Sequence, residues 1–125
     1  MTDQSSPATP AAALPPPSDR WSRVMSTITA QARRTNLTRV ADLGAALDAA
    51  AVRGLDAAGW AAAERTAHQL AGSAGTFGFD GVSAIARSLE RFFAQSGAAG
   101  SSDPLRLAEA RAQLNQASDQ LTRGE

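Results

Sequence analysis

The placement of proline limits the possible folds of this chain more than any other feature. Five of the six prolines lie within residues 1–17, and the sixth is Pro104. Proline removes a backbone donor and breaks helix interiors, so residues 18–103 are free to form helices and residues 1–17 are not. We expect residues 1–17 to be a disordered Pro/Ala-rich tail and residues 18–123 to form one helical bundle domain.

Apolar residues recur at helical spacing through the proline-free region. Five helices are predicted, at roughly residues 19–33, 37–53, 57–77, 81–95 and 104–122. Asn36, Asp80 and Asp103 precede three of these helices, as N-cap residues do. Short connections between amphipathic helices favour an all-α fold, an antiparallel four-helix bundle with an additional N-terminal helix.

Two details of this prediction concern the first helix and the connection between the last two helices. The first helix carries Trp21, Val24, Met25 and Ile28 at helical spacing. Residues 96–102, with the sequence SGAAGSS, are expected to form a flexible connection between the last two helices.

The composition excludes several classes of function. The 12 acidic and 12 basic residues give a formal net charge of zero, so no nucleic-acid footprint is expected. Every basic residue is an arginine, which excludes Schiff-base chemistry and a P-loop lysine. The single histidine and the lack of cysteine leave no multi-histidine or thiolate metal site within one chain. We therefore expect neither a metal nor another cofactor.

The same sequence offers little to a membrane. No apolar run approaches the roughly 20 residues needed to cross a bilayer. The first residues, MTDQSS, lack the positive region of a secretory signal. We expect a cytoplasmic protein that binds neither membranes nor nucleic acids.

The only histidine, His68, lies on the third predicted helix, away from its apolar stripe. That stripe has spacings of 3, 4, 3, 4 and 3 residues, and it consists of Trp60, Ala63, Ala67, Leu70, Ala74 and Phe77. At about 100° per residue, His68 lies roughly 135° from the middle of the stripe. We therefore expect its imidazole to be exposed.

Small residues follow His68 on its own side of the helix. Helical side chains lean toward the N-terminus, so Gly72 and Ala71 leave the imidazole uncovered, and Gly75 continues the gap. We interpret this gap as an opening through which a large partner reaches the histidine. The other interpretations are a surface histidine without function and glycines that permit close helix packing or end a helix, as Gly78 does at a C-terminal cap. Packing is the weaker interpretation for Gly72 and Gly75, because both project away from the apolar stripe.

The segment from His68 to Gly78, HQLAGSAGTFG, resembles the signature of histidine phosphotransfer (HPt) domains. That signature is His, any residue, Leu, usually Lys, Gly, small residues, an apolar residue and Gly. A later Leu-Glu pair of the family is matched by Leu89 and Glu90. The resemblance covers roughly residues 20–122, and it implies a four-helix bundle whose phospho-accepting histidine, here His68, is exposed midway along one helix.

The resemblance also implies a function. His68 would accept a phosphoryl group from the aspartate of a receiver domain and pass it to a second receiver, which supplies the magnesium ion and the acidic pocket. The chain would be a phosphoryl carrier in a phosphorelay, not an enzyme with its own turnover. Its partners would be response-regulator receiver domains, a hybrid histidine kinase, or both. We expect a monomer that binds each partner transiently.

One residue departs from the family pattern. The usual lysine three residues after the histidine is Ala71 here, and Arg65, Arg87 and Arg91 are candidates to replace its charge. The ordinary interpretation of each arginine is a solvated surface charge. Glu64, four residues before His68, is a candidate to accept the ring N–H and fix the tautomer, unless it is a surface carboxylate.

The expected docking surface surrounds His68. It consists of the small residues Ala61, Ala71, Gly72 and Gly75. Phe79, near the next turn, is either an exposed apolar anchor or a hydrophobic staple for the fourth helix, and we favour the staple.

Two alternative functions stay open. The first is an HPt-like docking module that binds a receiver or kinase without being phosphorylated, and Ala71 in place of lysine favours it. The second is a structural bundle that dimerises through its alanine-rich faces, which predicts that the glycine face is buried between subunits.

Overall fold

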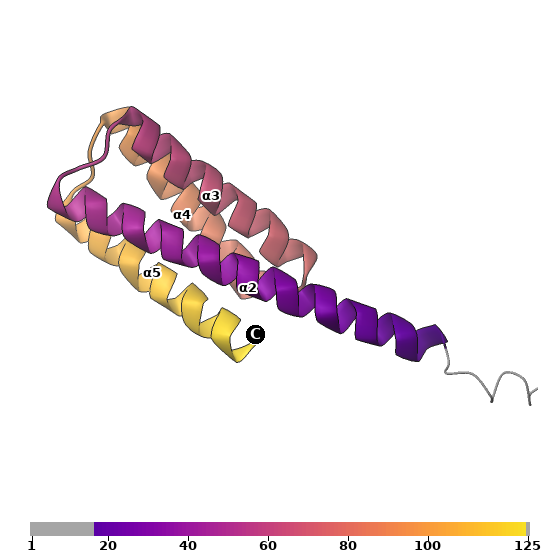
Figure 1. Ribbon diagram of the computed structural model, residues 1–125. Helices are drawn as coiled ribbons and strands as arrows, with labels where there is room; N and C mark the ends of the chain where they lie inside the picture. The colour runs from indigo at the N-terminus through magenta and orange to yellow at the C-terminus, as the bar shows by residue number, and fades with distance from the viewer. Residues whose placement is uncertain (1–16, 125) are drawn as a thin grey trace, which may run out of the picture. The chain divides into compact units, whose positions relative to one another are not determined.

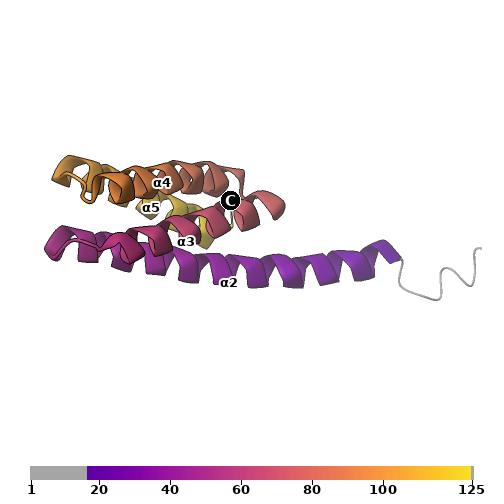
Figure 2. The same ribbon diagram turned by 90° about the horizontal axis from the view of Figure 1, so that it is seen from above.

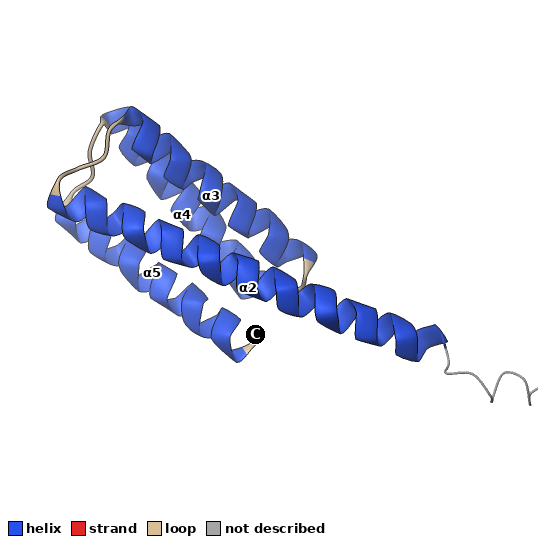
Figure 3. Cartoon of the chain, in the orientation of Figure 1, coloured by secondary structure: helices blue, strands red, loops and turns tan. Residues whose placement is uncertain are grey.

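The computed structural model describes residues 17–124, which form four helices and no strand. The helices are α2 (Pro17–Val52), α3 (Ala57–Thr76), α4 (Asp80–Ala99) and α5 (Pro104–Arg123), joined by short loops (Figures 1 and 3). The predicted all-α bundle is confirmed. Of the predicted tail, residues 1–16 lie outside the described residues, and Pro17 is the first residue of α2.

The chain divides at Gln31 into two units, and each is described by itself. In the first unit, residues 17–31 are helical, and Trp21, Val24 and Ile28 are 66%, 48% and 40% exposed. These three side chains are therefore exposed to solvent. The described part of this unit is a single helix, and one helix has no second element against which to bury an apolar face.

The predicted break between residues 33 and 37 is absent, so the additional N-terminal helix and the first bundle helix are one helix. Asn36, expected as an N-cap, is fully buried inside α2. Its Nδ2 donates to Ser73 Oγ at 3.2 Å, and its Oδ1 accepts from Arg39 Nη1 at 2.8 Å. A buried amide with such partners packs well within a helix, so Asn36 joins α2 to α3 instead of starting a helix.

In the second unit, residues 32–52 of α2 and the other three helices surround one core, and α4 contacts both α3 and α5 (Figure 2). All four helices contribute its largest fully buried apolar side chains, which include Leu43, Leu70, Leu89, Phe93, Leu114 and Leu121. Alanines fill much of the remaining interior, namely Ala63, Ala67, Ala74, Ala86, Ala110 and Ala117. Because alanine has a single methyl group, the helices approach closely around a thin core.

Two helices begin at a carboxylate cap, whereas Asp80, expected as an N-cap residue, is the first residue of α4, and the N-cap there, Phe79, makes no side-chain cap hydrogen bond. Asp56 Oδ1 accepts from the backbone N–H of Gly59 at 2.8 Å, and Asp103 Oδ1 accepts from that of Arg106 at 2.8 Å. These carboxylates satisfy N–H groups that have no partner within the first turn of a helix.

The predicted flexible connection at residues 96–102 is shorter than expected, because α4 continues to Ala99. Ser96 is buried, and a Cβ added to Gly97 would lie 3.1 Å from Trp60 Cβ. Packing against α3 therefore holds this segment in the helix despite its low intrinsic helix propensity. The turn comes at Gly100, where φ is 79°, a value that glycine adopts readily.

Candidate functional site

His68 lies on the outer surface of α3, and its side chain is 75% exposed. On the other side of the helix, Trp60, Ala63, Ala67, Leu70 and Ala74 are buried. This division between an apolar inner face and an exposed histidine agrees with the helical spacing in the sequence.

The imidazole of His68 is held by a carboxylate on the neighbouring helix. His68 Nδ1 lies 3.0 Å from Glu90 Oε2 of α4, and the Glu90 side chain is 29% exposed. Because a carboxylate oxygen accepts hydrogen bonds, Nδ1 carries the ring proton and Nε2 keeps its lone pair. The pairing therefore sets both the tautomer and the orientation of the ring.

The expectation that Glu64 is this partner is wrong. Glu64 lies one turn before His68 on α3, but the carboxylate at hydrogen-bond distance from the ring belongs to Glu90. Glu90 reaches the ring because α4 packs beside α3.

Gly72 and Gly75, which follow His68 on α3, have different surroundings. A Cβ added to Gly72 would meet nothing within 4 Å, so the helix surface one turn after His68 is bare. A Cβ added to Gly75 would lie 3.3 Å from Ser83 Oγ of α4. Gly72 therefore leaves the helix surface after His68 open, whereas Gly75 lets α4 approach α3. Close packing was the weaker interpretation of Gly75 from the helical spacing.

Ala71 does not belong to the exposed patch in which the sequence places it. It is 4% exposed, and its carbonyl accepts a hydrogen bond from Ser83 Oγ at 2.8 Å. Position 71 is turned toward α4 and the core, so its methyl group is covered. Ala61, in contrast, is exposed as expected.

Phe79 is 5% exposed and packs within the core at the start of α4. An exposed apolar anchor is therefore excluded at this position. A packing role, the interpretation favoured from the sequence, agrees with its burial.

The candidate arginines lie on different sides of the site. Arg65 is exposed on α3, three residues before His68. Arg87 is exposed on α4 and lines an open groove that also contains Gly72 and Gly75. Arg91 is also exposed, but it lines the groove between α4 and α5. Of the two candidates on α4, only Arg87 borders the groove that contains Gly72.

Glu90 is the site residue that reasoning from the sequence did not assign. It was matched only as part of a Leu-Glu pair, without a role. Its signal in the sequence is weak: Ser83, Arg87 and Glu90 fall at i, i+4 and i+7, on one side of a helix. That spacing predicts a polar stripe, but the partner on α3 follows only from the register between the two helices.

The described residues restrict two further kinds of function. Between residues 17 and 124, no three His, Cys, Asp or Glu side chains are grouped so as to hold a metal ion. None of the four described helices is both long and apolar enough to cross a membrane.

Comparison with known families agrees with this geometry. The model of the Hpt domain family matches residues 28–123, a range that contains His68, Glu90 and the whole of α3, α4 and α5. Comparisons with curated proteins and with solved structures gave no match. Hpt domains are helical-bundle phosphocarrier modules of phosphorelays, in which they interact with receiver domains and histidine kinases. The match covers most of the chain, and the chain therefore belongs to the Hpt domain family.

Proposed function

We propose that this Hpt domain carries a phosphoryl group on Nε2 of His68, accepting it from one receiver-domain aspartate and passing it to another. The observation that supports this proposal most strongly is the exposed imidazole whose Nδ1 donates to Glu90 at 3.0 Å. With the proton fixed on Nδ1, the nucleophilic lone pair is on Nε2, and no hydrogen bond within the described residues occupies that nitrogen.

The transfer step follows from this tautomer. The Nε2 lone pair attacks the phosphorus of an aspartyl phosphate, the P–O bond to the aspartate breaks, and the carboxylate leaves with the bonding electrons. The ring gains positive charge as the N–P bond forms, and the Glu90 carboxylate stabilises that charge through the Nδ1 proton. When a second receiver's aspartate attacks the phosphorus, the N–P electrons return to Nε2, so the domain ends the cycle unchanged.

The surface around His68 is suited to a partner that must reach the ring. Gly72 adds no side chain one turn after the histidine, and Ala61 adds only a methyl group two turns before it. In-line phosphoryl transfer needs close approach of donor and acceptor atoms, so small side chains around the histidine favour it. We include in the proposal a cytoplasmic, monomeric domain over residues 18–123 that releases each partner after transfer.

The test is phosphoryl transfer from a phosphorylated receiver domain of the same organism to the full chain. The expected result is an acid-labile label on the wild type and on Glu64→Gln, and no label on His68→Gln. Glu64→Gln is a suitable control, because it changes a charge one turn from His68 without touching the His68–Glu90 pair. Equal labelling of His68→Gln would overturn the proposal.

A second candidate function is a docking module that binds receivers without being phosphorylated. Ala71 in place of the family's usual lysine favours it, since that lysine helps to neutralise the incoming group. Receiver binding with no label on the wild type, under conditions in which another Hpt domain is labelled, would support this alternative.

A further inference from the structure

A phosphoryl group on His68 creates a local excess of negative charge. The group brings between one and two negative charges at neutral pH, next to the carboxylate of Glu90, which lies 3.0 Å from the ring. The residue three positions after His68 supplies no cation, because it is the buried Ala71. A nearby cation would therefore favour the phosphorylated form strongly.

Helices α3 and α4 carry six charged side chains besides His68. They are Glu64 and Arg65 on α3, and Asp80, Arg87, Glu90 and Arg91 on α4. Only the arginines carry positive charge, so the cation must be sought among Arg65, Arg87 and Arg91.

Two cross-helix contacts bracket the position of Arg87. On one side, Ser83 Oγ donates to the Ala71 carbonyl at 2.8 Å, and on the other, Glu90 meets His68 at 3.0 Å. Arg87 lies between Ser83 and Glu90 on the same stripe of α4, and it is about 4.5 Å, less than one turn, from Glu90 along the helix axis. It therefore faces the part of α3 between Ala71 and His68.

The surface between Arg87 and Gly72, one turn after His68, is open. Arg87 lines a groove together with Gly72, where an added Cβ would meet nothing within 4 Å. Arg87 is exposed and forms no hydrogen bond or ion pair with another described residue. Arg91 instead lines a groove with Arg106 and Glu109 of α5, and Arg65 is not among the residues of the groove at Gly72.

We propose that Arg87 binds the phosphoryl group of phosphorylated His68, its guanidinium crossing the bare surface of Gly72 to supply the positive charge that position 71 lacks. This inference rests on the proposed function, since it requires a phosphoryl group on His68. The planar guanidinium donates two parallel N–H bonds to phosphoryl oxygens, a geometry that suits a group presented from a neighbouring helix.

The direct test needs no partner protein. The full chain is phosphorylated chemically with phosphoramidate, and the phosphoryl resonance is followed by ³¹P NMR as a function of pH in the wild type, Arg87→Ala, Arg87→Lys and Arg91→Ala. A guanidinium favours the dianion and lowers the phosphoryl pKa, so Arg87→Ala raises that pKa by about 0.5 to 1 pH unit. The phosphoryl pKa of Arg87→Lys is expected to lie between those of the wild type and Arg87→Ala. Arg91→Ala, the matched control on the same helix, should have the same phosphoryl pKa as the wild type.

Circular dichroism is used to check that the variants keep their helix content, so that a changed phosphoryl pKa reports on the charge at position 87. Transfer from a phosphorylated receiver to Arg87→Ala is expected to be about tenfold slower than to Arg91→Ala. An unchanged phosphoryl pKa in Arg87→Ala overturns the inference, whether or not receivers label the chain. A shifted pKa without labelling from any receiver supports Arg87 and contradicts the relay function, and failure of phosphoramidate to label His68 overturns both.

Discussion

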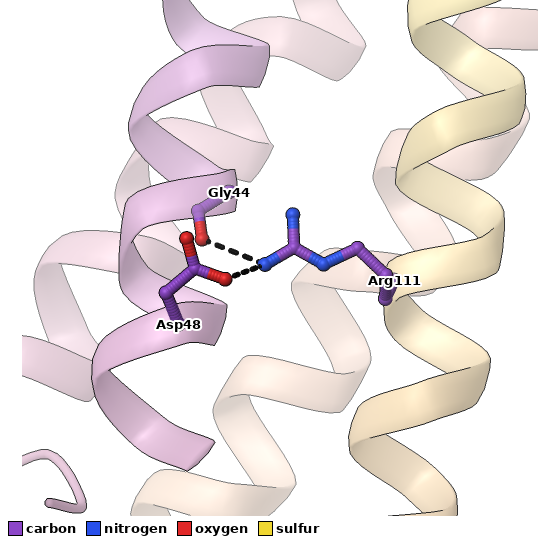
Figure 4. Close-up of polar contacts among 3 residues, drawn as sticks. All are labelled: Gly44, Asp48 and Arg111. Carbon is purple, nitrogen blue, oxygen red and sulfur yellow. Dashed lines mark hydrogen bonds and ion pairs between the residues drawn. The ribbon is translucent and has the colours of Figure 1, made fainter. Parts of the chain in front are cut away.

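Where α5 meets α2, Arg111 reaches across to the other helix. Its Nη2 donates to the carbonyl of Gly44 at 3.1 Å and to the carboxylate of Asp48 (Figure 4). Where α4 meets α3, the carboxylate of Glu90 reaches across to His68. In each of these two helix pairs, a polar side-chain contact thus joins one helix to the other.

Each region contains a helix glycine, Gly44 at α2–α5 and Gly72 at α3–α4, and the two regions differ in what occupies the space beside it. A Cβ added to Gly44 would lie 3.2 Å from Arg111 Nη1, so the guanidinium fills the space that the glycine leaves. A Cβ added to Gly72, one turn after His68, would meet nothing within 4 Å. The same residue type thus admits a side chain of the domain itself at α2–α5 and leaves room for a partner at α3–α4. A glycine in a helix is informative about function only when its surroundings are known.

The largest effect is expected from filling the empty space. Gly72→Phe places an aromatic ring over the helix turn beside His68, which prevents the receiver's phosphoryl group from reaching Nε2. Transfer from a phosphorylated receiver should fall about 100-fold, since a displacement of about 1 Å at a reacting centre has effects of that size. The rate is measured by acid-labile labelling, with chemical unfolding as the check on the fold.

Gly72→Phe should not lower the stability of the domain, because no described atom lies near the added Cβ. Wild-type transfer rates in this variant would contradict the interpretation of Gly72 as the opening.

Removing the partner of the imidazole is expected to have the next largest effect. Glu90→Ala frees Nδ1, so the ring loses its fixed tautomer and the charge that stabilises the phosphorylated state. Transfer should slow about tenfold, the size expected for one charge-assisted hydrogen bond near the surface. Glu64→Ala, which removes the same side chain from α3, is the matched control and should transfer like the wild type. Equal rates for the two variants would argue against a role for Glu90.

A smaller effect, on stability alone, is expected at α2–α5. Arg111→Ala removes the contacts to Gly44 and Asp48, and the free energy of unfolding should fall by about 1 kcal/mol, as for a partly exposed ion pair. Transfer through His68 should stay unchanged, because α2 and α5 do not contribute to the site. Urea unfolding with Arg53→Ala as the control measures the change, and a loss of transfer without a loss of stability would contradict the separation of the two regions.

The smallest effect distinguishes Gly72 from Gly75 on α3. Gly72→Ala should raise the free energy of unfolding by about 0.5 to 1 kcal/mol, because alanine is the better helix former and its methyl group has room. Gly75→Ala should gain less, since its Cβ would lie 3.3 Å from Ser83 Oγ, which is held by a hydrogen bond to Ala71. Equal gains in thermal unfolding would show that the close approach at Gly75 is not a constraint.

Much of α3 was predictable because its signal is local. The 3-4 spacing from Trp60 to Ala74 defines the buried face, and the exposed position of His68 follows from the same count. The break predicted between residues 33 and 37 was wrong for a non-local reason. Asparagine is a good N-cap in isolation, but here Ser73 and Arg39 satisfy its side chain inside α2.

The surroundings of the candidate site were only partly predictable. Gly72 and Gly75 look equivalent in the sequence, and only the position of Ser83 on α4 separates them. Glu90 is 22 residues from His68, so its contact depends on the register of two helices, which helical spacing alone does not determine.

The central claim is that the phosphoryl group is carried on Nε2 of His68. The most direct measurement is NMR of the chain after ¹⁵N-histidine labelling and phosphorylation by a receiver, in which the coupling to phosphorus identifies the substituted ring nitrogen. Because Glu90 holds the proton on Nδ1, the account predicts coupling at Nε2 alone. Coupling at Nδ1, or an imidazole that stays unmodified while the receiver loses its phosphoryl group, would contradict it.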